Sequence, residues 1–454
     1  MMHRDAGGAT VVERPGPGRK VIVNARVIRL RMWWDGAFWV IPLTGIVLAV
    51  LADQLVDGID ESLADSFGSS ALLSPSSAVT LLAAVGGGMV TFTGFVFSVV
   101  LLIIQFGSSS YSPRTVSYFL RSRVTQTVLG IFLATITYAF LALISIGSGR
   151  ESYVPVAGVL VCLILLLVSL VAFLVLIQSV AGRIRVDSLV SELGRLAGRA
   201  LNRNRSFGPP VDDGAGPVDP APGGTVVRHR GRVGQVVGID VAAAARLAAD
   251  TGALVAFQVG IGDGVVPGTV IARVDGTAAA QTLDRCVIVH RERSLAYDPG
   301  YALRILTDIG LRALSPAIND PTTAVRALDE VEGVLRTAAA LRLGPARIPA
   351  GSGGVVVRAP SWSDIVDLAV WEVIDAGATS PQVTRRLSRL LDDLLADLPP
   401  DRHPVLVRYR ELLNSSVREL VGPERAETWL TGDRQGIGGS RSIRSAGGPE
   451  TSPD

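Results

Sequence analysis

Four long apolar runs without any charged residue constrain this chain more than any other feature. They cover residues 37–52, 78–106, 124–147 and 154–180. A helix needs about 20 apolar residues to cross the hydrocarbon core of a bilayer. A helix in a soluble core would instead show a polar face every three or four residues. The runs therefore predict an α-helical membrane protein with four transmembrane helices, of which the first is the shortest.

The distribution of arginine predicts the orientation of these helices. Basic residues precede the first run from Arg14 to Arg31 and follow the fourth run from Arg183 to Arg205, and three more lie after the second run, Arg114, Arg121 and Arg123. The charged residues in the connection between the first two runs are all acidic, from Asp53 to Asp65. Basic loops stay on the cytoplasmic side. We therefore expect a multi-pass protein of the bacterial cytoplasmic (inner) membrane with both termini in the cytoplasm.

Changes in composition divide the chain into six segments. We expect a basic N-terminal segment (1–31), a transmembrane domain (32–182), an amphipathic stalk helix (183–206), a linker rich in Pro, Gly and Asp (207–225), a cytoplasmic α+β domain (226–430) and a disordered tail (431–454).

The α+β domain begins with short strands and continues with helices. Strands are expected at 226–228, 234–239, 254–259 and 270–274, with a helix at 241–250. The stretch VGIGDGVVPGTVIARV, residues 259–274, resembles half of a biotinyl or lipoyl carrier domain, which implies a small barrel-like β-hairpin unit. A carrier also needs a lysine, and Lys20 is the only lysine of the chain, so that function is excluded. Helices are expected at 301–314, 321–341, 363–376, 381–398 and 403–421.

Two segments resemble a known family. The segment ALSPAINDPTTA, residues 313–324, resembles the hallmark of a family of uncharacterised predicted bacterial membrane proteins (domain of unknown function 2254). The end of the second run, with Phe97-Ser98, Gln105, Ser109 and Ser112-Pro113-Arg114, is similar to the same family. The resemblance extends from the first run to about residue 430. It implies membrane location and architecture, and it brings no catalytic residue.

The hallmark segment has two interpretations. In the first, Pro316 ends one helix, Asp320 caps the next and Pro321 occupies its first position, which makes a helix-turn-helix corner. In the second, polar side chains form a pocket for a small ligand or ion: Arg304, Asp308, Arg312, Asn319, Asp320, Thr322 and Thr323. Caps and turns are far commoner than pockets, so the first interpretation is favoured.

Small and polar residues form a stripe on the second run. Helical spacing places five of them on one face: Gly87, Thr91, Gly94, Ser98 and Gln105. Such residues let membrane helices approach closely, and packing is the favoured interpretation. The alternative is a pore lining made by several subunits. Because no run contains Asp, Glu, Lys, Arg or His, proton-coupled transport is disfavoured.

Enzymatic signatures are absent from the sequence. It contains no GxSxG, HExxH, Walker or CxxC motif, and its four histidines are scattered, so no catalytic residue, metal or cofactor is expected. A net charge of +2 gives no reason to expect nucleic acid as a partner. We expect contact with the lipid bilayer and self-association, as an oligomeric channel-like or passive transport protein with a regulatory cytoplasmic domain. The alternative is a membrane-anchored scaffold or sensor, with an enzyme third. Any small-molecule or ion ligand is unidentified.

Overall fold

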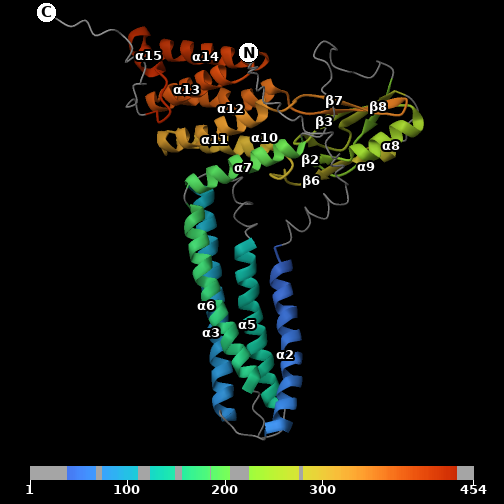
Figure 1. Ribbon diagram of the computed structural model, residues 1–454, viewed down its shortest axis with the longest axis vertical. Coiled ribbons are helices and arrows are strands. Elements are labelled where there is room, and N and C mark those ends of the chain that lie inside the picture. The colour runs from blue at the N-terminus through green and yellow to red at the C-terminus, as the bar shows by residue number, and fades with distance from the viewer. Residues whose placement is uncertain are drawn as a thin grey trace, which may run out of the picture. The chain divides into compact units, whose positions relative to one another are not determined.

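The computed structural model describes residues 38–67, 74–110, 123–148, 156–184, 186–204, 224–275 and 280–436 (Figure 1). The described residues fall into two compact units. One contains Ala200–Tyr297 and Leu341–Pro360, and the other contains Arg29–Arg199, Asp298–Ala340 and Ser361–Asp454. The region expected as one α+β domain is thus divided, with its strands in the first unit and its long C-terminal helices in the second.

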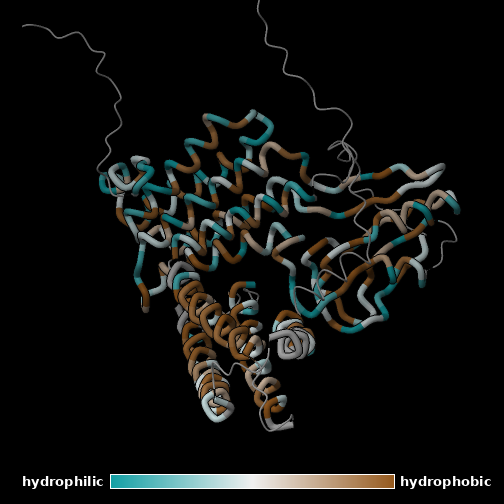
Figure 2. The backbone as a smooth tube through the Cα atoms, turned by 60° about the horizontal axis from the view of Figure 1, so that its bottom comes forward, coloured by the Kyte–Doolittle hydropathy of each residue, from teal (hydrophilic) through white to brown (hydrophobic). Residues whose placement is uncertain are grey.

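The described residues between 38 and 184 form long apolar helices. They are α2 (Val40–Phe67), α3 (Pro75–Ser110), α5 (Arg123–Ser148) and α6 (Val156–Ile184). Within the described residues, three segments are long and apolar enough to cross a membrane: Ser76–Ile103, Arg123–Ile146 and Val156–Val180. The apolar part of α2, Val40–Val56, is shorter. Apolar residues run along most of the length of these helices (Figure 2).

Helix α2 is longer than the sequence analysis predicted. The acidic stretch from Asp53 to Asp65, expected in a connection between two spans, continues the helix to Phe67. The stretch contains no proline and only one glycine, Gly58, so nothing in it breaks a helix. The charged residues therefore mark where the apolar surface of α2 ends, while the helix itself continues.

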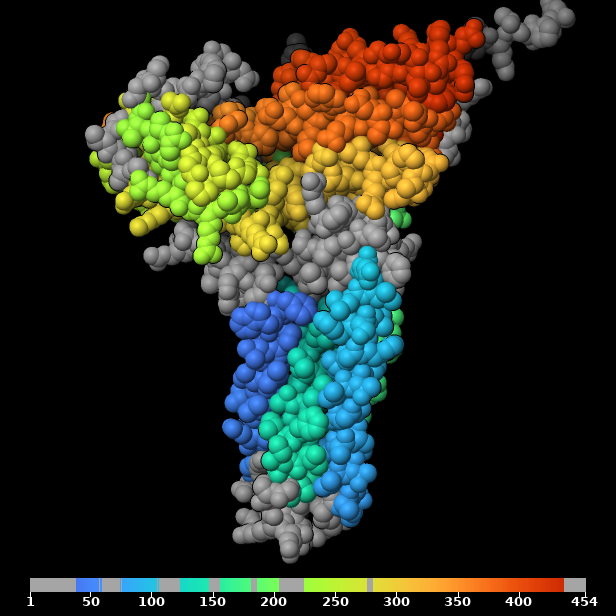
Figure 3. Space-filling view, turned by 180° about the vertical axis from the view of Figure 1, so that it is seen from behind, coloured from blue at the N-terminus to red at the C-terminus, as the bar shows by residue number. Residues whose placement is uncertain are grey.

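Helix α5 is the central helix of this bundle. It packs against α2, α3 and α6, and it lies between α2 and α3 on the face shown in Figure 3. Its Phe132 and Tyr138 are completely buried. The hydroxyl groups of Thr135 on α5 and Ser169 on α6 are also buried and lie 2.8 Å apart. A hydrogen bond between hydroxyl groups is a common contact between helices in lipid.

The stalk helix expected at 183–206 is present as α7 (Val186–Asn204). Its apolar residues Leu189, Val190 and Leu193 are buried. The Ser191 hydroxyl donates a hydrogen bond to Glu330 Oε1 of α11 at 2.8 Å. Helix α7 therefore contacts α11 within the second unit.

The first unit is built on two small sheets. Strands β1 (Thr225–Arg228), β5 (Val270–Asp275), β3 (Leu254–Gly260), β8 (Gly353–Arg358) and β7 (Ala346–Ala350) form a sheet in this order. Strands β4 (Gly264–Val265), β2 (Gly234–Ile239) and β6 (Val287–His290) form the other. Helices α8 (Val241–Thr251) and α9 (Ala280–Cys286) complete the unit.

The strand pairing differs from that of the expected barrel-like hairpin. Strands β3 and β5 do pair antiparallel, with Val255 opposite Val274. The intervening β4, however, pairs with β2 in the second sheet, and β3 pairs in parallel with β8 on its other side. The antiparallel pairing of β3 with β5 is present, whereas the barrel-like hairpin unit is not confirmed, because the intervening β4 belongs to the other sheet. Strands β7 and β8 were not predicted.

The remaining helices belong to the second unit. They are α10 (Pro299–Ala313), α11 (Pro321–Ala339), α12 (Trp362–Gly377), α13 (Pro381–Asp397), α14 (His403–Val421) and α15 (Pro423–Leu430). The first five agree with the predicted ranges to within a few residues, and α15 was not predicted. Helix α13 packs against α11 and α14 and buries Leu387, Leu390 and Leu391 completely. The predicted linker, up to residue 223, and the tail from residue 437 lie outside the described residues.

Candidate functional site

The hallmark segment forms the corner between α10 and α11. The Ser315 hydroxyl donates to the carbonyl of Arg312 at 2.7 Å, and the backbone N–H of Asn319 donates to the carbonyl of Ser315 at 2.8 Å. Asn319 has a φ of 49°, the left-handed conformation that asparagine tolerates better than most residues. The Asp320 amide then donates to the carbonyl of Ala313 at 2.7 Å. These bonds turn the chain sharply from one helix into the next.

Asp320 caps α11, as the sequence predicted. Its Oδ1 accepts from the backbone N–H of Thr323 at 3.1 Å, and its Oδ2 accepts from the Thr323 hydroxyl at 2.6 Å. Pro321 is the first residue of the helix, where its missing N–H costs nothing. Both carboxylate oxygens thus have a local partner, while Asn319 and Thr322 are exposed.

Arg304 and Asp308 lie in the part of α10 that precedes the corner. Arg304 Nε donates to Asp308 Oδ1 at 2.7 Å, and the same guanidinium forms a bidentate ion pair with Glu372 of α12. The hydrogen bond to Glu372 is the main reason why the pKa of Arg304 is raised. Arg312 lies eight positions after Arg304, which corresponds to about 12 Å along a helix. The structure therefore brings together Arg304 with Asp308, and Asp320 with Thr323, as two local groups.

The small-residue stripe of α3 faces away from the helices that pack on α3. At 100° per residue, the buried Ala78, Leu82 and Met89 share one side of the helix. The stripe of Gly87, Thr91, Gly94, Ser98 and Gln105 lies about 180° from that side, and all five residues are exposed. A Cβ added at Gly87 or Gly94 would meet no atom of the described chain within 4 Å.

The hydroxyl groups of the stripe bond within their own helix. Thr91 Oγ1 donates to the carbonyl of Gly87 at 3.2 Å, and Ser98 Oγ donates to the carbonyl of Gly94 at 2.9 Å. Each oxygen can still accept a hydrogen bond from a neighbour. The stripe is therefore a small, uncharged and weakly polar surface on the outside of the described bundle.

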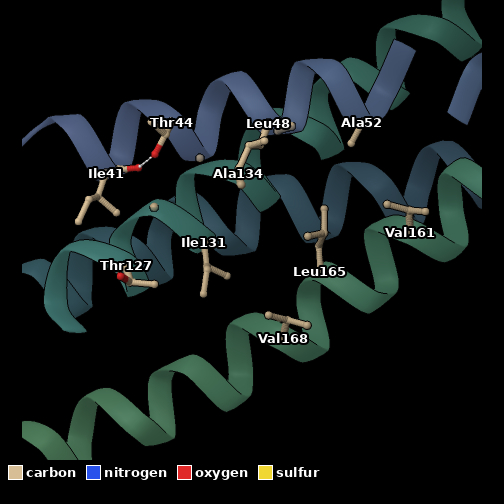
Figure 4. A pocket seen from close by; sticks show the side chains of 13 residues that line it. Ile41, Thr44, Leu48, Ala52, Thr127, Ile131, Ala134, Val161, Leu165 and Val168 are labelled. Carbon is tan, nitrogen blue, oxygen red and sulfur yellow. Dashed lines mark hydrogen bonds between the residues drawn. The ribbon is translucent and has the colours of Figure 1, made fainter. Parts of the chain in front are cut away.

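A groove of about 360 Å³ opens between α2, α5 and α6 (Figure 4). Its lining is almost wholly apolar: Ile41, Thr44, Gly45, Leu48, Ala49, Ala52, Thr127, Gly130, Ile131, Ala134, Val161, Leu165 and Val168. The Thr44 hydroxyl donates to the carbonyl of Ile41 at 2.7 Å. The groove therefore suits hydrocarbon better than a polar ligand.

Sequence reasoning missed a buried ionic cluster between α11 and α13. Arg386 is 3% exposed, and it donates to Asp329 Oδ1 and Glu332 Oε2, both at 2.7 Å. Glu332 also accepts from Arg336 at 2.8 Å. Only the spacing of four between Glu332 and Arg336 is visible in the sequence. Within the described residues, no group of three or more His, Cys, Asp or Glu side chains could hold a metal ion.

Long apolar helices followed by a mixed α/β C-terminal part are the features of a membrane protein. The family model described as Predicted membrane protein (DUF2254) matches residues 35–393, and the chain belongs to this family. It is similar to the uncharacterized protein Mb1321c of Mycobacterium bovis and the uncharacterized protein Rv1290c of Mycobacterium tuberculosis. Each is 30% identical over 412 residues, which cover 85% of this chain and 77% of the relative. No solved structure matches the chain.

Proposed function

We propose that this protein assembles into a homo-oligomer around α3 and provides a passive, channel-like pathway across the bacterial cytoplasmic membrane. The observation that carries the proposal is the position of the stripe. It lies opposite the packed side of α3, where a Cβ at Gly87 or Gly94 would meet no atom of another described helix within 4 Å. Small and hydroxylated residues favour close approach of helices in lipid. A ring of such helices would line a pathway with uncharged hydrogen-bonding groups.

The proposal includes four spans, with α2 as the first. The apolar stretch Val40–Val56 corresponds to about 26 Å of helix, close to the thickness of the hydrocarbon core. The arginine distribution supports a cytoplasmic location for both termini and for the proposed regulatory soluble portion. A cysteine at the exposed Ser74, between α2 and α3, should react with an impermeant thiol reagent on spheroplasts, and one at the exposed Ser352 should not. The reverse pattern would refute this orientation.

Cross-linking tests the role of α3. In native membranes, oxidation of Thr91→Cys or Ser98→Cys should give covalent oligomers of the full-length protein. Val99→Cys is the matched control, because Val99 is also exposed but lies about 100° from Ser98 around the helix. Gly94→Leu should lower the oligomeric fraction, whereas Val99→Leu should not. Equal cross-linking at Ser98 and Val99 would refute an interface centred on the stripe.

A membrane-anchored scaffold or sensor is the second candidate. It is favoured by the absence of charged residues from the apolar runs and by the large soluble portion of the chain. Flux measurements separate the two functions. Purified oligomer in liposomes should pass potassium ions or glycerol, and Gly94→Leu should reduce the flux together with the oligomer. An oligomer that passes neither solute would favour the scaffold.

A further inference from the structure

One end of the three-stranded sheet combines exposed valines with exposed arginines. Strand β2 begins there, and β4 and β6 end there, because both pair with β2 antiparallel. Gly234 pairs with Val265, so the next step of the register places Val233 beside Val266. These two side chains are 68% and 50% exposed. Together the two valines form a small exposed apolar patch at this end of the sheet.

Arginines surround these valines in the sequence and in the strand register. Arg228, Arg230 and Arg232 precede Val233, and all three are exposed. The pairing of Gln235 with His290 places the exposed Arg291 alongside Gly234. Among the described residues, the acidic Asp263, Asp284 and Glu292 adjoin this end of the sheet. We call Arg228, Arg230, Arg232, Arg291, Val233 and Val266 the arginine edge.

Hydrogen bonds hold the two valine-bearing loops together. Arg228 Nη1 donates to the carbonyl of Gly268 at 2.8 Å, and the backbone of His229 pairs with Thr269 and Gly268, both at 2.8 Å. The buried His229 ring has Nδ1 3.1 Å from Asp284 Oδ1 and Nε2 3.1 Å from the carbonyl of Arg232. Asp284 is thus engaged beneath the loop. The backbone of the arginine edge is thus held in place, so binding would order mainly its exposed arginine side chains.

We propose that the arginine edge docks on a bilayer surface that contains anionic phospholipid headgroups. Guanidinium groups form bidentate hydrogen bonds with phosphate, and apolar loop tips insert at the boundary between headgroups and acyl chains. The covalent connection keeps the arginine edge close to the bilayer, because the membrane helix α6 ends at Ile184 and β1 begins soon afterwards, at Thr225. Nucleic acid is the less suitable partner, since the edge contains no aromatic side chain on which a base could stack.

An environment-sensitive fluorophore on Val266→Cys tests the proposal in the full-length protein. The native cysteines should react slowly, because Cys162 and Cys286 are buried and burial raises the pKa of Cys286 to about 11. Ser352→Cys is the matched control. It is exposed in the same unit, next to Gly353 at the end of the large sheet where β3 begins. Each protein is placed in nanodiscs of phosphatidylcholine alone or mixed with phosphatidylglycerol.

The label at position 266 should shift to shorter wavelengths and be shielded from iodide only in the anionic discs. The label at 352 should give the same emission in both. High salt should abolish the response. The triple change Arg230→Gln, Arg232→Gln and Arg291→Gln should weaken docking about fivefold per arginine, roughly a hundredfold in all. The corresponding triple change to lysine should weaken it much less, because lysine keeps the charge and loses only the bidentate hydrogen bonds.

Three results would overturn the proposal. They are equal emission of the 266 label in both discs, a salt-resistant response, and an unchanged response in a folded glutamine variant. A shift caused by short single-stranded RNA in phosphatidylcholine discs would assign the edge to nucleic acid instead. The discs carry the same lipid on both faces, and the readout needs neither an oligomer nor flux. Failure here is therefore distinguishable from failure of the proposed channel.

Discussion

Gly45 of α2 and Gly130 of α5 meet so closely that a Cβ on Gly45 would overlap the carbonyl oxygen of Gly130. In the other direction, a Cβ on Gly130 would lie 3.2 Å from the carbonyl oxygen of Ile41. The two backbones are therefore in direct contact. This contact holds α2, whose apolar segment is the shortest of the four, against the central helix of the bundle.

Replacing Gly45 with alanine should separate α2 from α5. We expect Gly45→Ala to destabilise the protein by about 1–3 kcal/mol, the usual cost of an overpacked contact. Gly58→Ala is the control within the same helix, since its Cβ would meet no atom within 4 Å. The measurement is thermal unfolding of the purified protein in detergent. Equal melting temperatures for the two variants would contradict the close contact.

The cap at Asp320 predicts how its substitutions differ. Asparagine can still accept from the Thr323 amide, so Asp320→Asn should stay within about 1 kcal/mol of the native stability, and Asp320→Ala should lose about 0.5–2 kcal/mol. Thermal melts of the full-length chain measure this. Complementation of a deletion strain adds the second readout, because a carboxylate needed for ligand binding would make the asparagine variant stable but inactive. Equal destabilisation by both changes would argue against the cap.

Arg386 and Arg336 share Glu332 but differ in exposure. The Arg386 side chain is 4% exposed and the Arg336 side chain is 35% exposed. Arg386→Ala leaves Glu332 and Asp329 without their buried partner and should cost about 3 kcal/mol. Arg336→Ala should cost less than about 1 kcal/mol, since water screens its ion pairs. Chemical denaturation of both variants gives the comparison. A loss of stability for Arg386→Ala no larger than that for Arg336→Ala would contradict the difference expected from burial.

Tyr409 should make stability depend on alkaline pH. Burial, and then its hydrogen bond to Asp367 at 2.7 Å, raise the pKa of Tyr409 to about 12. The folded state therefore holds this proton more tightly than the unfolded chain, where tyrosine has a pKa of about 10. Its contribution is complete below pH 10 and is lost as the pH rises from about 10 to 12. Tyr409→Phe should remove this dependence, which melts across that range would detect.

The membrane helices were predictable because lipid imposes a strict rule on the sequence. Charge-free runs of the required length located α3, α5 and α6 to within a few residues at most ends. Strands β7 and β8 follow no comparable rule. Pro349 and the glycines at 351, 353 and 354 are typical of a loop, and β8 is fixed by its pairing with the distant β3. Gly353 is required there, because a Cβ would overlap the carbonyl oxygen of Ala253.

The candidate sites also differ in whether the local sequence predicts them. The cap of Asp320 on Thr323 spans three residues, and the stripe of α3 lies on one helix, so local spacing predicts both. Arg386 contacts Asp329 and Glu332, which lie more than fifty residues earlier, and α13 has other arginines at 385 and 389. Nothing in the local sequence distinguishes the buried arginine from its neighbours. Tertiary packing alone selects it.

The parallel pairing of β3 with β8 also sets an order of events during synthesis. Leu254 pairs with Gly354, 100 residues later, and the intervening chain includes α10 and α11, which belong to the other compact unit. At 5–20 residues per second, one edge of β3 stays open for roughly 5 to 20 s after it leaves the ribosome. An open strand edge is a template for aggregation. A nascent chain that stalls before β8 is therefore the form most in need of a chaperone.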